Sequence, residues 1–144
     1  TVMHLVLPDT SIAGCYYITA VDSAQYGNES VASNVVCVDN CPYYWLPNVF
    51  SPNGDGNNDF FIPFPYKYVK DIEMYIYNRW GNLVFETTNP DILWNGISKE
   101  NDKLLVEGVY YYVCKVNTIR LIGIDPVELH GFVHLFHDEK AVNK

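Results

Sequence analysis

Oxygen-bearing side chains recur at every second position in the segment PNGDGNND. This alternation is typical of loops that bind a hard cation such as calcium, and the candidate ligands are Asn53, Asp55, Asn57 and Asp59. An EF-hand loop needs Gly at its sixth position and an acid at its twelfth, and counting from Asn53 or from Asp55 meets neither requirement. The alternative, which we favour, is an Asx-rich turn whose side chains accept backbone N–H groups. Calcium is then an optional cofactor, and no other cofactor is expected.

The four cysteines indicate disulfide chemistry. Cys15 and Cys37 lie at nearly equal distances from a turn near Tyr26, so a hairpin would place them opposite each other. The other pair, Cys41 and Cys114, would have to meet through the tertiary fold. Among the three possible pairings we predict Cys15–Cys37 with Cys41–Cys114. A zinc site is the rival, but Cys37 and Cys41 lack a second close pair. Disulfides in turn indicate an exported protein.

Enzymatic chemistry has little support in the sequence. On a strand His130 and His134 share a face while His137 points away, so a three-ligand metal site is not predicted. Asp55 and Asp59 are spaced like a glycosidase pair, but nothing holds them across a cleft. We find no nucleophile elbow, no phosphate-binding glycine loop followed by Lys and no His-Glu metal helix. We therefore predict that the chain is not an enzyme.

Composition restricts the class of protein further. A chain of 144 residues with 49% apolar content can form one domain of ordinary size plus a fragment. A net charge of −8 with nine Lys and Arg argues against a nucleic-acid partner. No apolar run is as long as a membrane span, and the first residues do not resemble a secretory signal. Twelve Tyr and seven Phe, with frequent turn residues and no helical periodicity, predict an all-β fold.

Several segments can be placed on strands or turns. Residues 46–50 read as a strand, and the turn cluster that follows reverses the chain. Residues 71–77 and 82–87 form the clearest hairpin, and its tight connection presents Arg79 and Trp80. Further strands are expected at 108–116, around 117–124 and at 128–137, with Asp125-Pro126 between the last two. Strand 108–116 is apolar on both faces, so it is either covered twice or offers one face to another protein.

Residues 1–40 form a separate segment in this interpretation. Short strands are expected at 4–7, 15–21 and 30–38, with a turn at Gly27-Asn28. The stretch TAVDSAQYGNES is similar to the penultimate loop of fibronectin-type-III-like modules, so the segment resembles the end of such a sandwich. The alternative is an extra hairpin that belongs to the following domain.

Five motifs in order resemble one known family. They are LPNVFSPNGDGNNDFF with YNRWG, then VF, then WNG, then GVYYY, and finally GFVHL. They are similar to the gliding-motility-associated C-terminal domain, which comprises the type B sorting domains of the bacterial type IX secretion system. The resemblance covers about residues 42–137 and implies an Ig-like antiparallel β-sandwich. We therefore expect a partial β-sandwich segment at 1–40, a sorting domain at 41–137 and a tail at 138–144.

The resemblance also implies a function. Such domains act as non-catalytic C-terminal addresses that carry an upstream cargo through the type IX translocon to the cell surface. The implied partners are outer-membrane proteins of the translocon, including a β-barrel of the PorP/SprF type. The residues that we expect to bind a partner are Arg79, Trp80, Phe132, His134 and Phe136.

The alternative function is a glycan-binding or adhesive β-sandwich, in which a Trp side chain stacks on a sugar ring. The candidates are Trp45, Trp80 and Trp94. The chain also departs from the family pattern, because Ser51 stands where Thr is more common and Asn95 where Asp is more common.

Overall fold

The computed structural model describes residues 11–23 and 27–137. These residues form seven strands and no helix: β1 (Gly14–Tyr16), β2 (Val36–Val38), β3 (Val49–Phe50), β4 (Val69–Tyr77), β5 (Leu83–Thr87), β6 (Gly108–Arg120) and β7 (Gly123–Leu135). None of the described segments is a helix that could cross a membrane. The all-β prediction is confirmed, while the expected strand at 4–7 and the tail at 138–144 lie outside the described residues.

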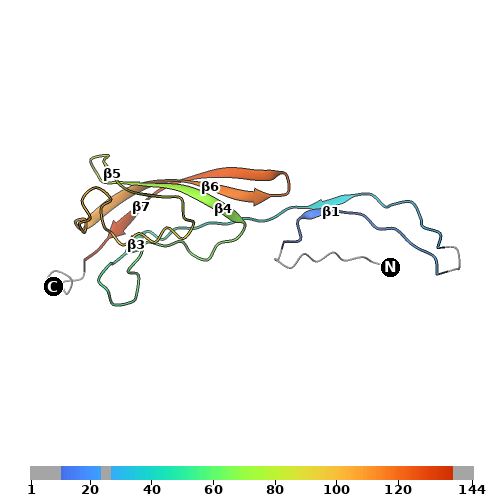
Figure 1. Ribbon diagram of the computed structural model, residues 1–144, viewed down its shortest axis with the longest axis horizontal. Helices are drawn as coiled ribbons and strands as arrows, with labels where there is room; N and C mark the ends of the chain where they lie inside the picture. The colour runs from blue at the N-terminus through green and yellow to red at the C-terminus, as the bar shows by residue number, and fades with distance from the viewer. Residues whose placement is uncertain (1–10, 24–26, 138–144) are drawn as a thin grey trace.

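The strands form two sheets of very different size. A five-stranded sheet has the order β3-β7-β6-β4-β5, and β1 pairs with β2 in a two-stranded ribbon. All neighbours in the large sheet are antiparallel except β3 and β7, which are parallel. The ribbon continues away from the large sheet along the long axis of the molecule (Figure 1).

The layer that covers the large sheet is built from extended segments. They are joined by the isolated bridges Tyr43↔Lys67, Phe61↔Trp94 and Ile97↔Leu104. Side chains of this layer and of the sheet form one buried cluster, so the domain is an Ig-like β-sandwich with an irregular second layer. The second layer contributes Tyr44, Phe61, Ile92 and Trp94, and the sheet contributes Phe50, Ile72, Met74, Ile76, Val84, Tyr110, Cys114, Val116, Val133 and Leu135.

Strands β6 and β7 form a long hairpin whose register runs without a break from Gly108↔Leu135 to Arg120↔Gly123. The predicted connection at Asp125-Pro126 is wrong, because both residues lie inside β7. Continuous alternation directs the backbone of Pro126 away from β6, where its missing N–H costs no ladder hydrogen bond.

Trp94 lies at the centre of the core and is fully buried. Its indole ring contacts the rings of Phe50, Phe61, Phe85 and Tyr110, with centroid distances between 5.1 and 6.4 Å. The indole N–H donates to the carbonyl oxygen of residue 97 over 3.0 Å, so the only polar atom of the side chain is satisfied. Trp94 therefore joins the second layer to the sheet.

A disulfide links the two strands of the ribbon. Cys15 pairs with Cys37 in the register of β1 and β2, and the two form a disulfide, as predicted. The strands are shorter than the predicted 15–21 and 30–38. The backbone beyond them is nevertheless paired, since Ser30 N–H donates to Ala20 and Ser33 N–H donates to Ile18.

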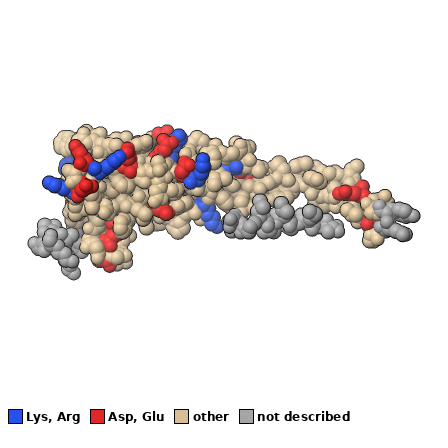
Figure 2. Space-filling model, in the orientation of Figure 1, with Lys and Arg blue, Asp and Glu red and all other residues tan. Residues whose placement is uncertain are grey.

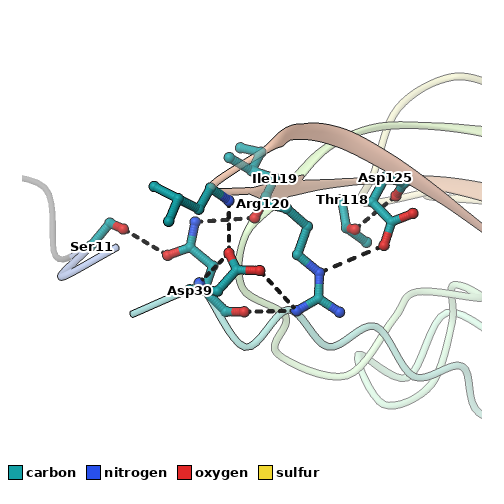
Figure 3. Close-up of polar contacts among 8 residues, drawn as sticks. Ser11, Asp39, Thr118, Ile119, Arg120 and Asp125 are labelled. Atoms are coloured by element: carbon teal, nitrogen blue, oxygen red, sulfur yellow. Dashed lines mark hydrogen bonds and ion pairs between the residues drawn. The ribbon is translucent and has the colours of Figure 1, made fainter. Parts of the chain in front are cut away.

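Asn40 attaches the ribbon to the end of the β6–β7 hairpin. Its side chain is buried, and its amide nitrogen donates to the carbonyl oxygen of Ile119 over 3.0 Å (Figure 3). Its amide oxygen accepts the hydroxyl of Ser11 over 2.6 Å. One side chain thus bonds to both parts of the molecule.

Arg120 completes this contact. The Nη1 atom donates to the carbonyl oxygen of Asn40 over 2.9 Å and lies 3.7 Å from a carboxylate oxygen of Asp39. Nε lies 3.6 Å from the carboxylate of Asp125, and the N–H of Leu121 donates to Asp39 over 2.7 Å (Figure 3). We call the contacts of Asp39 and Asn40 with residues 119–121 the junction clasp.

Gly96 provides a test of how tightly the two layers pack. Its φ is +78°, and an added Cβ would lie 2.8 Å from Cδ1 of the buried Leu135. Gly81 has a similar φ of +81° but no atom within 4 Å of the added Cβ. Gly81→Ala should cost about 1 kcal/mol of unfolding free energy for backbone strain alone. Gly96→Ala should cost about 1–3 kcal/mol more, because it also overpacks the core.

Guanidinium denaturation of the two variants measures this difference. Equal losses in both proteins would show that Leu135 moves aside and that the layers pack loosely at this point.

Candidate partner-binding surfaces

The turn after β3 closes on its own side chains. The carboxylate of Asp59 accepts the backbone N–H groups of Gly54 and Gly56 over 2.6 and 2.8 Å. At the base of the turn the N–H of Ser51 donates to the carbonyl oxygen of Asn58 over 2.9 Å. The segment therefore reverses the chain as expected.

Asp55 and Asn53 bond to each other at the tip. The Asp55 carboxylate accepts the N–H of Asn57 over 2.7 Å and the side-chain amide of Asn53 over 3.0 Å. These hydrogen bonds, with the backbone bond from Asn57 first, lower the pKa of Asp55. The geometry is that of an Asx-rich turn. A calcium ion would have to compete with these N–H donors for the same oxygens, so calcium binding stays the less favoured hypothesis.

Calorimetric titration of the full chain with millimolar calcium tests the ion site. We expect no heat of binding, since the side-chain oxygens of Asp55 and Asp59 already accept backbone N–H groups. Heat that disappears in the Asp55→Asn variant would establish a calcium site instead.

The tip between β4 and β5 is a rigid turn that exposes two large side chains. The Asn78 side-chain oxygen accepts the N–H groups of Trp80 and Asn82, both over 3.0 Å. The N–H of Gly81 donates to the carbonyl oxygen of Asn78 over 2.9 Å. Trp80 is 78% exposed, and the guanidinium carbon of Arg79 lies 5.7 Å from its ring centroid. The pair is thus presented to solvent on a fixed backbone.

Three rings follow one another on the exposed side of β7 and just beyond its end. The Phe132 and His134 rings are 5.7 Å apart and meet edge to face, and the His134 and Phe136 rings are stacked at 5.8 Å. Phe132 and Phe136 are 46% and 45% exposed. The structure therefore brings the three predicted β7 residues together, at a separate place from Arg79 and Trp80.

An aromatic row across the outer face of the sheet was missed by the sequence interpretation. Phe132 pairs with Tyr111, Tyr111 with Tyr77, and Tyr77 with Leu83. Residues paired across neighbouring strands project from the same face, so these side chains form a row over four strands. The sequence signal for this row was that residues 108–116 are apolar on both faces. Of the two explanations, a strand covered on both sides or a strand with one open face, the exposure of Tyr111 supports the second.

The outward edge of β7 is largely unpaired among the described residues. β3 meets β7 only at His134 and Leu135, whereas β7 begins at Gly123. Pro126 lies on this free edge and limits the pairing of further strands at that point. Between Pro126 and His134 no described segment forms backbone hydrogen bonds with this edge.

These features gather at one end of the sheet. Tyr77, which precedes the Arg79–Trp80 tip, pairs with Tyr111 near the start of β6, and Leu135 pairs with Gly108. The junction clasp lies at Arg120, at the opposite end of β6. Figure 1 shows the same polarity, with the ribbon and the end of β7 at opposite ends of the molecule.

The predicted Cys41–Cys114 disulfide is wrong, since both thiols are free, Cys41 exposed and Cys114 buried. Asn40, next to Cys41, is bonded to Ile119, which lies five residues beyond Cys114 on β6. Five residues of extended strand span about 16 Å, so the contact that holds residue 40 lies well away from Cys114.

The three tryptophans differ in exposure. Trp94 is fully buried, so its proposed role in stacking on a sugar ring is wrong. Trp45 is 67% exposed and Trp80 is 78% exposed. Only these two could contact a ligand.

The histidines do not meet in a metal site. No group of three or more His, Cys, Asp or Glu side chains that could hold an ion occurs within residues 11–23 and 27–137. His130 lies 3.5 Å from Glu128 on the exposed side of β7. The Nε2 atom of His137 is buried and has no hydrogen-bond partner in the described part of the chain.

The buried thiol of Cys114 should make the free energy of unfolding depend on pH in the alkaline range. Burial raises its pKa from about 9 to about 12. Above about pH 9 the unfolded chain releases this proton while the native protein keeps it, so the free energy of unfolding should fall as pH rises. Burial also raises the pKa of Tyr44, but this residue contributes only above about pH 10, the usual pKa of tyrosine.

Urea denaturation between about pH 9 and 10 measures the slope, in a background in which Cys15, Cys37 and Cys41 are replaced by Ser. Cys114 is then the only cysteine and has no disulfide to exchange with. Cys114→Ala should flatten the slope in this window. If the slope is the same in the Cys114→Ala variant, the pH dependence belongs to another group.

Comparison with known proteins gives one family. Residues 44–124, more than half of the chain, match the CHU_C type IX secretion signal domain. No curated protein matches the chain. The match includes the turn after β3 and the Arg79–Trp80 tip, and it ends before Phe132, His134 and Phe136. The chain belongs to the family of type IX secretion signal domains.

Proposed function

We propose that this domain is a non-catalytic C-terminal sorting signal that directs an upstream cargo through the type IX secretion system to the cell surface. The observation that carries the proposal is the family match over residues 44–124. Recognition is by protein–protein contact, and the partners are outer-membrane proteins of the translocon, including a β-barrel of the PorP/SprF type. Calcium binding at the turn after β3 is not required for this function.

The Arg79–Trp80 tip is one contact with the translocon. Trp and Arg are the side chains most enriched at energetically dominant interface positions. The three hydrogen bonds around Asn78 hold the turn in shape, so little conformational entropy is lost when Trp80 enters a partner. A cavity of about 110 Å³ lies between this tip and residues 105–110.

The end of β7 is the second contact. Phe132, His134 and Phe136 offer a continuous ring surface, and the free edge beside them can accept a strand from the partner. Exposed aromatic surface of this kind is unfavourable in water unless a partner covers it. Both contacts lie at the end of the sheet that faces away from the ribbon.

The ribbon connects the cargo to the signal. Residues 1–40 are the last strands of a fibronectin-type-III or Ig-like module, and residues 41–137 are the sorting domain. Isolated two-stranded ribbons are marginally stable in water. The Cys15–Cys37 disulfide and the junction clasp supply part of the missing stability.

Export of a fluorescent passenger fused to the full chain tests the function, in a bacterium that has a type IX system. Trp80→Ala should reduce surface display several-fold, because it removes an anchor of the contact. Trp45→Ala is the matched control, since Trp45 is similarly exposed but lies outside both contacts, and should leave export unchanged. Equal export of all three proteins would contradict the role of the tip.

The β7 contact needs point substitutions rather than truncation. Deletion of residues 131–144 would remove Val133 and Leu135 from the core, so lost export would not separate recognition from unfolding. Phe132→Ala with Phe136→Ala should lower export while the melting temperature stays near that of the parent. Ile124→Ala, at an exposed position near the other end of β7, is the control. Glycan-array binding that requires Trp45 would instead favour the glycan-binding alternative.

A further inference from the structure

An apolar groove lies on the side of the domain formed by residues 46–51 and 58–65. Its volume is about 690 Å³. Four apolar side chains that line it remain about half exposed: Val49 at 46%, Phe60 at 47%, Ile62 at 45% and Phe64 at 56%. Neither the Arg79–Trp80 tip nor the β7 rings line this groove.

Backbone hydrogen bonds join the two walls of the groove at their ends. At one end the N–H of Phe64 donates to the carbonyl oxygen of Trp45 over 2.9 Å. At the other end the N–H of Ser51 donates to the carbonyl oxygen of Asn58, also over 2.9 Å. Between these points no backbone hydrogen bond joins the two walls in the described part of the chain.

The β3 wall directs free backbone groups into the groove. The carbonyl oxygens of Asn48 and Phe50 accept N–H groups from His134 and Phe136, so both face β7. Backbone groups alternate in direction along a strand, and those of Val49 therefore face the opposite side. Val49 offers one N–H and one carbonyl oxygen to an incoming strand.

The opposite wall repeats this arrangement. Phe61 exchanges both backbone hydrogen bonds with Trp94, at 2.7 and 3.4 Å, and so faces away from the groove. By the same alternation the backbone of Ile62 faces the groove. Open N–H and carbonyl groups on a groove wall are the recognition elements of β-augmentation.

The charge near the groove is acidic. Asn58 lines the groove, and the turn that leads to it carries Asp55 and Asp59. In Figure 2 the acidic atoms on the projecting turn have no Lys or Arg beside them on the visible face. The net charge of the chain is −8. A basic residue at one end of an extended ligand would therefore be attracted to this end of the groove.

We propose that the groove binds an extended, mostly apolar peptide segment of a partner protein that carries a basic residue next to the acidic turn. The segment pairs with the backbone at Val49 and Ile62 and places alternate apolar side chains against Phe60 and Phe64. This site goes beyond the two contacts assigned to export, and its test does not depend on export.

Titration of the ¹⁵N-labelled full chain with a synthetic hexapeptide, acetyl-Arg-Val-Thr-Val-Thr-Val-amide, tests the proposal by NMR. Saturable shifts should be confined to the amides of residues 46–51 and 58–65. A peptide with N-methyl groups on alternate amides should bind about tenfold more weakly, because it loses backbone hydrogen bonds. Replacing Arg by Glu should weaken binding several-fold at low salt.

Matched variants locate the site. Ile62→Asn should weaken binding, whereas Ile124→Asn, at an equally exposed position on β7, should not. No shifts at millimolar peptide, or shifts outside the groove, would overturn the proposal. Equal affinity for the N-methylated peptide would exclude strand pairing, and equal affinity for the Glu peptide would exclude the basic residue.

Discussion

The packing of Trp94 between the two layers is the interaction on which the rest of the domain depends. In the large sheet, continuous ladders of backbone hydrogen bonds hold the strands together. The covering layer has only isolated bridges, so side-chain burial must supply the cohesion that ladders supply elsewhere. Replacing a buried Trp by Ala costs about 3–5 kcal/mol, a large share of the stability of a small domain. The turn after β3 leads into this layer, and residues 58–65 of the layer form one wall of the groove.

The inner and outer faces of the large sheet have different roles. Tyr110, Cys114 and Val116 of β6 are buried, while the alternate residue Tyr111 is exposed. This explains why β6 is apolar on both sides, since one face forms the core and the other carries the aromatic row. A face on a long, fully paired hairpin keeps its shape without a partner. The row is therefore a preorganised surface, and binding to it requires little reordering.

Much of the sheet could be predicted from local patterns. The expected hairpin at 71–77 and 82–87 differs by at most two residues from β4 and β5, because period-two apolar spacing and the tight turn from Asn78 to Gly81 are local signals. The Cys15–Cys37 disulfide followed in the same way from hairpin symmetry. The Cys41–Cys114 pairing failed because it was deduced by elimination and depended on a long-range distance that local patterns do not contain.

The candidate surfaces were only partly predictable for the same reason. The position of Arg79 and Trp80 at a turn tip was predictable because the turn is a local signal, whereas the contacts among the rings of Phe132, His134 and Phe136 became visible only in the structure. The aromatic row and the groove combine residues from several segments, so their existence depends on register and layer packing. Trp94 was misjudged since exposure of an aromatic residue near a turn cannot be read from its neighbours in sequence.

The junction clasp fixes the distance between the ribbon and the opposite end of the sheet, where the Arg79–Trp80 tip lies. It attaches the ribbon at Arg120, and β6 is 13 residues long, so the sheet extends about 43 Å from there to the opposite end. The ribbon leaves in the other direction along the same axis (Figure 1). In the proposed function, a passenger joined to the ribbon is therefore held on the side opposite to the Arg79–Trp80 tip. If the tip stays unobstructed in this way, the same sorting domain could be joined to many unrelated upstream proteins.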